Sequence, residues 1–486
     1  MTTANPMPYT LAQSAGRVDK EAFDANQIAK ETIERAHKKH ALNAFVSPPG
    51  DEIFEQAAHA NALRAHKNHT PLTGAPIAVA DNIVTSWGET EAGSAMLHGY
   101  ASPFNATVID RLLEAGALIF GKTNVAELGV GITTQASHHG VTRNPVCLSH
   151  IVGGTAAGSA AAVGSYLVPA ALAVDTLGGA RIAAAHTSIV ALRPTYGAIS
   201  RYGVLAYASS MDAVTIFAHD IPDIATIYDR ISGHDPKDGT STPAPRVDTV
   251  PALDTPSKKL RVGVAKELLA LPMSDLSKRA VEHAIDLMRE QGCEIIEVSL
   301  PTADRMSQIA SIIASAEAST NFARYDGVRF GHRAKDVHSI EALYEQSRAE
   351  GFGPDVIHTI LLGTYAMYRD NYQTHFQRAQ RVRHRVALEY KRIFENVDVL
   401  LGPAAAETAP TADCLPPTPQ QAAWAMRFTA GEALAGLPAV TLPAGCCPDG
   451  LPIAIQLTAD RHNEATLLGA AHALQQWQSS NEEGKS

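Results

Sequence analysis

The chain has 486 residues, of which 45% are hydrophobic and 19% are charged. This length and composition are typical of a folded protein with a large core, built as one large α/β domain or as two to three average domains. Its formal net charge of −10 argues against direct binding to nucleic acid, because surfaces that bind nucleic acid are basic.

The five cysteines are too few and too irregularly spaced for a disulfide framework or a zinc site. We therefore expect no metal and no cofactor, and a reducing cytoplasm as the location. The N-terminus lacks the charged and apolar regions of a signal peptide, and no apolar stretch reaches ~18 residues without interruption. Neither export nor a membrane span is expected.

The first part of the chain predicts helices that alternate with buried strands. Apolar residues at helical spacing predict helices over 21–40 and 51–66. The run 75–83 predicts a buried strand, and 105–124 predicts a helix, a tight glycine turn and a second strand. Such alternation is typical of a mostly parallel sheet that is covered on both faces.

A segment of small residues follows at 153–175, with the sequence "GGTAAGSAAAVGSYLVPAALAVD". A helix of Ala, Gly and Ser can approach its neighbours closely, so we expect it to lie deep in the centre of the fold. The next residues, "DTLGGARIAAAH" (175–186), place two glycines at the start of an alanine-rich helix. Backbone N–H groups at such a turn can hold an anion, as an oxyanion hole does. The turn consists of Thr176, Leu177, Gly178 and Gly179, and we expect Asp175 and Arg181 to pair or to cap backbone groups beside it.

The second half of the chain predicts another α/β unit and a helical region. A strand over 258–269, a helix over 276–292 and a strand over 293–301 form the unit. Residues 301–395 turn helical and more charged, as expected for an insertion at the edge of the sheet. The proline-rich piece 414–421 predicts a surface loop, and the last segment predicts two strands around a Pro-Asp-Gly turn, followed by a C-terminal helix.

Several of these segments resemble the amidase-signature family, and together they cover nearly the whole chain. They include "PLTGAPIAVADNI", "GGTAAGSAAAV", "LRPTYGAISRYGVLAYASSMD" and "GLPIAIQL". The segments 323–334 and 348–365 are similar to one branch of that family, the A subunits of tRNA-dependent amidotransferases. The resemblance implies a single α/β domain over 1–486, with a large mixed, mostly parallel sheet flanked on both faces by helices. Within it we expect an N-terminal helical arm at about 1–66, a signature core at about 70–215 and a helical insertion at about 301–395.

The chemistry of that family requires a Ser–cis-Ser–Lys relay, in which a neutral lysine draws a proton through one serine from the nucleophilic serine. The resemblance places the lysine before Asp81, where this chain has Ala80. It places the bridging serine at Thr155 and the nucleophile at Gly179. All three positions are therefore expected to be vestigial, which would remove ordinary amidase and glutaminase activity.

The positions that the resemblance assigns to a glutamine substrate are also changed. His358 and Thr359 stand where an arginine is expected to meet the α-carboxylate, and Met426 stands near the aspartate expected to meet the α-amino group. Losing both charged contacts leaves a zwitterion unmatched. Glutamine is therefore not expected to be the ligand.

Two functions stay open at this point. The first is a non-hydrolysing pseudo-amidase that serves as a scaffold or regulatory subunit, with B- and C-type amidotransferase subunits or another protein as partner. The second is an enzyme with changed chemistry on an amide, imide or carboxylate ligand, which would use the turn with a repurposed set of side chains. Lys122 offers a substitute lysine, but a structural role is favoured for it. The candidates for the repurposed set are Thr155, His138, His139 and His186. We favour the pseudo-amidase.

Overall fold

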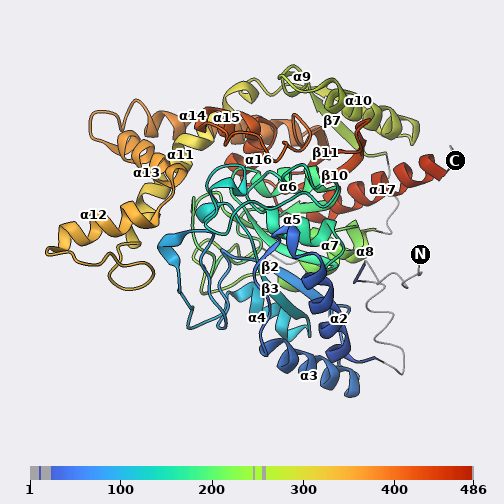
Figure 1. Ribbon diagram of the computed structural model, residues 1–486. Helices are drawn as coiled ribbons and strands as arrows, with labels where there is room; N and C mark the ends of the chain where they lie inside the picture. The colour runs from blue at the N-terminus through green and yellow to red at the C-terminus, as the bar shows by residue number, and fades with distance from the viewer. Residues whose placement is uncertain (1–9, 12–22, 245–246, 254–258, 484–486) are drawn as a thin grey trace.

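The computed structural model describes residues 10–11, 23–244, 247–253 and 259–483, and Figure 1 shows how its helices surround a central sheet. Eleven strands form this sheet in the order β1-β3-β2-β4-β6-β5-β10-β11-β9-β7-β8. In chain order the strands are β1 (Phe45–Ser47), β2 (Pro76–Ala80), β3 (Leu118–Thr123), β4 (Ala170–Asp175), β5 (Val190–Arg193), β6 (Ala213–Ala218), β7 (Arg261–Ala265), β8 (Glu294–Val298), β9 (Val399–Pro403), β10 (Ala439–Cys446) and β11 (Pro452–Thr458).

The α-helices of the described residues divide into those that cover the sheet and those that extend beyond it. In chain order they are α2 (Ala25–Lys38), α3 (Glu52–Ala65), α4 (Thr107–Glu114), α5 (Ala157–Gly164), α6 (Gly179–Thr187), α7 (Ile221–Ile231), α8 (Val250–Leu253), α9 (Lys266–Leu269), α10 (Asp275–Glu290), α11 (Met306–Asn321), α12 (Ile340–Gly351), α13 (Pro354–Met367), α14 (Phe376–Phe394), α15 (Pro419–Ala425), α16 (Ala430–Ala435) and α17 (Glu464–Glu483). In Figure 1, α12 and α13 extend away from the sheet at the left, whereas α2 and α3 lie at the bottom.

The expected mixed α/β sheet flanked by helices is confirmed. Parallel pairings join β2 to β3 and β4 on one side, and β7 to β8 and β9 on the other. The strands between these two groups pair antiparallel, so the parallel share is smaller than the alternation of helices and strands suggested. The reason is that β5 and β6, like β10 and β11, are joined without a crossover helix.

Most of the predicted elements are present with shifted ends. The helices predicted over 21–40 and 51–66 are α2 and α3, although residues 21–22 of the first prediction lie outside the described residues. The predicted strand–helix–strand unit is β7, α10 and β8, with its two strands parallel. The proline-rich loop ends earlier than predicted, because Thr418 caps α15 in a capping box with Gln421.

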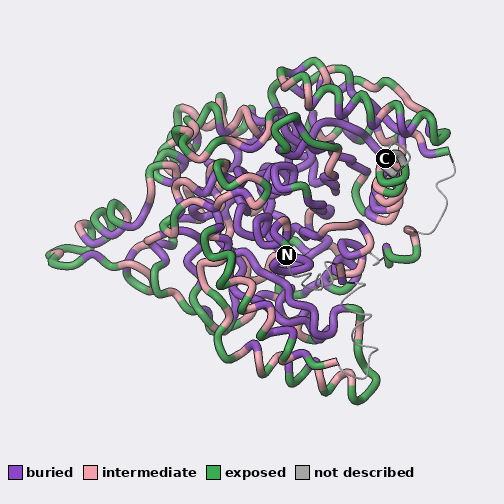
Figure 2. The backbone as a smooth tube through the Cα atoms, turned by 45° about the vertical axis from the view of Figure 1, so that its right-hand side comes forward, coloured by how far each residue is buried: buried purple, intermediate pink, exposed green. Residues whose placement is uncertain are grey.

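The small residues of α5 let this helix pack against the end of β3. A Cβ atom built at Gly158 would lie 2.3 Å from the backbone nitrogen of Asn124 and 2.5 Å from the carbonyl oxygen of Ala44. No residue other than glycine therefore fits there without moving the backbone. Every residue of α5 from Ala157 to Val163 is buried, and Figure 2 shows that buried residues fill the middle of the molecule, so the prediction of a central, closely packed helix is confirmed.

None of the helices in the described ranges is both long enough and apolar enough to cross a bilayer. The helical region expected at 301–395 contains α11 to α14. Helix α11 packs against α13, α14 and α16, and α14 also packs against α16, whereas α12 packs against the short helical turn Ala95–Leu97. The division of the chain into arm, core and insertion stays a prediction.

Candidate functional site

The glycine-rich turn lies between β4 and α6, on the side of the sheet where the parallel strands β2 and β4 end. Asp175 ends β4, and Gly178 caps the N-terminus of α6 with a φ of +106°. One carboxylate oxygen of Asp175 accepts the amide hydrogen of Gly178 (3.0 Å), and the other accepts from Nε of Arg181 (3.1 Å). The predicted pairing of Asp175 with Arg181 is thus confirmed, and it fixes the turn over the end of the strand.

Two further residues complete a buried charge network beneath the turn. Arg193 donates to the Asp175 carboxylate at 2.7 Å, and Arg181 donates to Glu432 at 3.1 Å. Burial raises the pKa of Asp175, but the two guanidinium groups outweigh it and hold the pKa of this carboxyl below its usual value. Two guanidinium groups face two carboxyl groups, so the charges of this buried network beneath the turn cancel.

The turn leaves backbone amides available to a ligand, among them the two that flank Gly178. The amide of Gly178 is used by Asp175, whereas those of Leu177 and Gly179 have no acceptor within the part of the chain that the structure describes. Because α6 begins at Gly179, its dipole adds positive potential at the same place. These amides can hold a carbonyl or carboxylate oxygen.

Two of the three positions expected to carry the relay lie against each other. The amide of Thr155 donates to the carbonyl of Gly179 at 3.2 Å, and a Cβ built at Gly179 would lie 2.5 Å from Oγ1 of Thr155. The threonine side chain therefore fills the space that a side chain at Gly179 would need. Ala80 is fully buried at the end of β2, the neighbour of β4 in the sheet, so it lies on the same side of the sheet.

The Thr155 hydroxyl lies against Gly179, the residue at which α6 begins. Thr155 is 8% exposed, and among the described residues its hydroxyl makes no hydrogen bond. An unbonded hydroxyl beside free amides is able to meet a ligand.

The three histidines proposed as a repurposed site are divided between two places. His186 is buried in α6, where its Nδ1 lies 2.8 Å from the carbonyl of Val152 and its Nε2 lies 3.2 Å from that of Glu407. Burial also lowers its pKa. His138 and His139 follow Thr134–Ala136 in another loop, where His139 contacts Glu91. The structure does not bring the two sets together at the turn.

Lys122 makes contacts with the loop that follows β2, as expected for a structural residue. Its ammonium group donates to the carbonyl of Ile83 and to Oγ1 of Thr90 (2.9 Å), and it lies 3.8 Å from Asp81. Burial lowers the pKa of Lys122 to about 8 and raises that of Asp81 to about 6. These contacts tie the loop after β2 to β3.

A small cavity of about 70 Å³ lies beside the turn and is lined by Leu177. The three residues expected at substrate positions, His358, Thr359 and Met426, all line it, so the structure brings these distant segments together. The volume is well below the several hundred Å³ typical of pockets for drug-sized ligands. The cavity suits a ligand of a few heavy atoms.

The sequence analysis missed two acidic groups, one that lines this cavity and one whose pKa that first group affects. Asp355 lines it, and Glu127 lies in the segment that leads to the lining residue Val130. Burial raises the pKa of Glu127 to about 7, although Ser94 and the amide of Gly353 bond to its carboxylate. Burial raises the pKa of Asp355 as well. No local pattern in the sequence signals this pair, because the two residues are over 200 positions apart.

We expect the free energy of unfolding to fall as the pH rises from about 5 to about 7. The pKa of Glu127 is raised from 4.5 to about 7, so in this range the folded protein keeps a proton that the unfolded chain has lost. Linkage then makes rising pH destabilising, by up to about 3 kcal/mol for a shift of this size.

Urea unfolding at a series of pH values checks this expectation, with Glu127→Gln as the variant. Its neutral amide cannot ionise, so its stability should fall less steeply with pH than that of the wild type. Glu297→Gln removes an exposed carboxylate and should leave the slope unchanged. Equal slopes for the wild type and Glu127→Gln would contradict the assignment.

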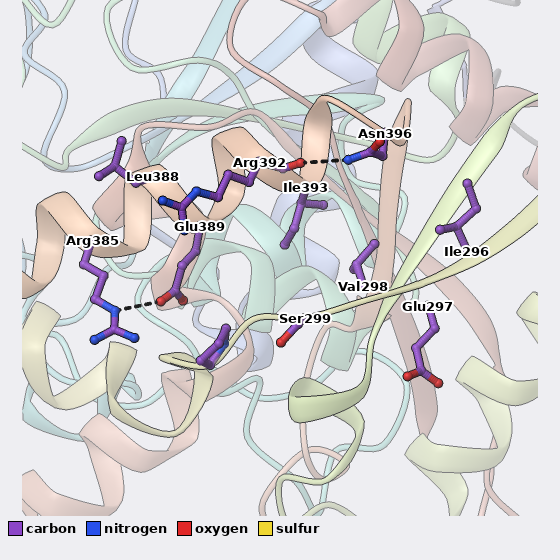
Figure 3. A pocket seen from close by; sticks show the side chains of 11 residues that line it. Ile296, Glu297, Val298, Ser299, Arg385, Leu388, Glu389, Arg392, Ile393 and Asn396 are labelled. Carbon is purple, nitrogen blue, oxygen red and sulfur yellow. Dashed lines mark hydrogen bonds and ion pairs between the residues drawn. The ribbon is translucent and has the colours of Figure 1, made fainter.

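A larger cavity, of about 770 Å³, lies elsewhere in the molecule, and Figure 3 shows it between β8 and α14. Glu297 and Ser299 line one side, and Arg385, Glu389 and Arg392 line the other. None of the residues of the turn lines it. It is therefore separate from the candidate site.

Comparison with known proteins shows similarity along the whole chain. Residues 27–468 match the family model described as amidase. Over 470 residues the chain is 38% identical to the A subunit of glutamyl-tRNA(Gln) amidotransferase from Neisseria meningitidis serogroup A, a match that covers 96% of this chain and 97% of that protein. The solved structure of the A subunit of glutamyl-tRNA(Gln) amidotransferase from Thermotoga maritima has a TM-score of 0.79 at 26% identity, covering 96% and 94% of the two chains. That of native peptide amidase from Stenotrophomonas maltophilia has a TM-score of 0.82 at 25% identity, covering 98% of each.

These matches overturn the expectation of a non-hydrolysing scaffold. Along its full length the chain is similar to proteins named as part of an amidotransferase and as a peptide amidase, and none of these matches points to a pseudo-amidase. The expectation was wrong because it equated three side chains, at positions 80, 155 and 179, with the whole activity. The surrounding turn keeps two free amides and an adjoining hydroxyl.

Proposed function

Because the chain belongs to the amidase family, we propose that it is an amide-cleaving enzyme of the amidotransferase A-subunit type. The observation that carries this proposal is that one turn has free amides, lies against a threonine hydroxyl and contributes a residue to the lining of a cavity. The three features are the free amides of Leu177 and Gly179, the unbonded hydroxyl of Thr155 and the cavity that Leu177 lines. Together they provide a place for an amide carbonyl, an attacking oxygen and room for a ligand.

In the proposed reaction the Thr155 hydroxyl attacks the carbon of a bound amide. The amides of Leu177 and Gly179 hold the carbonyl oxygen while it carries negative charge. The C–O bond forms, the C–N bond breaks, and the hydroxyl proton passes to the departing nitrogen, so ammonia or an amine leaves. Water then cleaves the ester to give a carboxylic acid and to regenerate Thr155. Ala80 and Gly179 contribute no ionisable or nucleophilic group, so the whole step depends on Thr155 and slow turnover is expected.

The proposed ligand is a small primary amide without the charges of glutamine. His358, Thr359 and Met426 line the cavity and offer neither a guanidinium for a carboxylate nor a carboxylate for an ammonium group. Asp355, whose pKa burial raises, is the one acid among the residues that line this cavity. A neutral amide of a few heavy atoms fits both the size and the polarity of the space.

We also propose that the chain works in a complex with B- and C-type amidotransferase subunits. The relative from Neisseria meningitidis is named as a subunit, and the match covers nearly its full length. The helix α13 and the residue that caps its C-terminus carry large apolar side chains that are exposed in the isolated chain, namely Ile357, Leu361, Tyr365 and Tyr368. Exposed apolar surfaces of this kind are typical of protein interfaces.

All five cysteines are unpaired, which supports a location in the cytoplasm.

Ammonia release from a panel of small amides tests the activity, with the chain alone and co-expressed with B- and C-type subunits. Acetamide, propionamide and glutamine form the panel, and glutamine should be the poorest substrate. Thr155→Ala should lower kcat at least about 1,000-fold, because losing the nucleophile disables the step. Thr155→Ser keeps a hydroxyl and should stay within about ten-fold of the wild type.

Thr374→Ala serves as the matched control, since it removes an exposed threonine hydroxyl far along the chain from the turn. It should leave the rate unchanged. Ammonia release that persists in Thr155→Ala would overturn the proposed chemistry. No release from any amide, with or without the subunits, would overturn the proposed function.

A further inference from the structure

A second cluster of reactive side chains lies outside the candidate site, in the loop that follows β2. We propose that Glu89, Glu91 and His98 bind one divalent transition-metal ion of the zinc class, with His139 as a positioning residue for the Glu91 carboxylate. One ligand atom from each of Glu89, Glu91 and His98 lies within 4.8 Å of the other two. The sequence analysis expected no metal, because it considered the number and spacing of the cysteines and not these carboxylates.

The Glu91 carboxylate is the centre of this cluster. Its Oε1 lies 2.7 Å from Nδ1 of His98, and its Oε2 lies 2.9 Å from Nε2 of His139. The contact with His139 lacks hydrogen-bond geometry, so this buried nitrogen has no hydrogen-bond partner among the described residues. The side chains thus bring imidazole and carboxylate donors together without satisfying all of them.

The backbone holds the cluster in place before any ion binds. The amide of Glu91 donates to Asp81 at 3.0 Å, and that of Gly99 donates to Oε1 of Glu91 at 3.0 Å. The amide of His138 donates to the carbonyl of Gly93 at 2.7 Å, which ties the histidine loop to the carboxylate loop. Only the exposed side chains of Glu89 and His98 have to adjust.

The donor set favours a borderline metal ion. Imidazole suits Zn²⁺ and its neighbours in the first transition row, whereas Mg²⁺ and Ca²⁺ prefer oxygen donors alone. Donors at 2.0–2.1 Å from a tetrahedral zinc ion lie about 3.3 Å apart, so a small opening of the 2.7 Å contact between His98 and Glu91 admits the ion. Water would complete the coordination of this exposed site.

Isothermal titration of the purified full-length chain with zinc chloride alone tests the site. We expect one saturable equivalent that is lost, or weakened at least about ten-fold, in His98→Ala and in Glu89→Gln. Both side chains are exposed, so these variants should fold, as circular dichroism can verify. Zinc should raise the Tm of the wild type but not that of His98→Ala, because only the folded wild type binds the ion.

His332→Ala is the matched control for histidine-dependent zinc binding. His332 pairs with Glu350 at 2.6 Å on the surface, and no third ligand group joins them within the described ranges. Its affinity for zinc should equal that of the wild type. His139→Ala should weaken zinc binding about ten-fold and shift the visible absorption spectrum of the cobalt(II)-loaded protein, as expected for a residue that orients a ligand.

Two results would overturn the proposal. One is the absence of a saturable zinc equivalent in the wild type. The other is equal zinc affinity in the wild type and in the double variant Glu89→Gln/His98→Ala. Neither measurement involves amide cleavage, so the metal site can be refuted without refuting the proposed function, and the reverse.

Discussion

Replacing Arg181 by glutamine is expected to lower the free energy of unfolding by about 3–5 kcal/mol, since removing one member of a buried charge network leaves its partners uncompensated. Arg181, Asp175 and Arg193 are all fully buried. Glu432 would lose its contact with the guanidinium group at 3.1 Å and would keep only hydroxyl donors such as that of Tyr390. Urea unfolding followed by circular dichroism measures the loss.

A double variant separates the charge from the shape of the side chain. Arg181→Gln leaves two carboxyl groups facing one guanidinium, whereas Arg181→Gln/Glu432→Gln restores one of each. If the charge imbalance dominates, the double variant should be at least about 1 kcal/mol more stable than the sum of the two single losses predicts. Simple additivity would show that the loss comes from packing and hydrogen bonds instead.

The surface pair of Arg289 with Asp286 supplies the control, since both side chains are more than half exposed at a separation of 2.5 Å. Arg289→Gln should change the stability by no more than about 1 kcal/mol. An effect of Arg181→Gln as small as that of Arg289→Gln would contradict the account of the network.

The sequence predicted local elements well and the arrangement of the central strands less well. Periodic apolar residues located α2, α3 and α10, because the helical repeat is a property of a continuous stretch. The antiparallel pairing of β4 with β6 and of β5 with β6 follows from packing between distant segments. No stretch of the sequence encodes that choice by itself.

The candidate site shows the same contrast between local features, which the sequence predicted, and contacts between distant segments, which it did not. The adjacent glycines at 178 and 179 signalled the turn, since a positive φ and free amides are properties of few residues in succession. Burial and the charge of Asp355 raise the pKa of Glu127 against the opposing hydrogen bond from the amide of Gly353, and these groups come from segments far apart. The contact of Glu91 with His98 had a local signal in the short spacing of its residues, but the approach of His139 did not.

The fit between Thr155 and Gly179 also emerges only in three dimensions. From the sequence, a threonine and a glycine 24 positions apart read as two independent losses from a relay. In the structure the threonine occupies the volume that a side chain at Gly179 would require, so the two residues depend on each other. This complementarity is why we assign the chemistry of the turn to Thr155 alone.

Replacing Gly178 by alanine should disrupt the turn itself. A Cβ atom there would lie 1.9 Å from Oγ1 and 2.1 Å from Cβ of Thr429, which itself donates to the carbonyl of Leu177 at 3.0 Å. The φ of +106° adds strain for any residue with a side chain. With about 1–2 kcal/mol from the backbone and about 1–3 kcal/mol from the overlap, we expect a loss of roughly 2–5 kcal/mol in unfolding free energy.

Gly445→Ala separates these two causes, because Gly445 has the same φ of +106° and no atom within 4 Å of the position that the alanine methyl group would take. Gly445→Ala should lower the free energy of unfolding only by the contribution of backbone strain, about 1–2 kcal/mol. Equal losses in both variants would show that the contact with Thr429 is relieved without cost. A larger loss in Gly178→Ala, together with reduced ammonia release, is expected instead, because moving Thr429 displaces the carbonyl of Leu177 and with it the neighbouring amides that we propose hold the ligand.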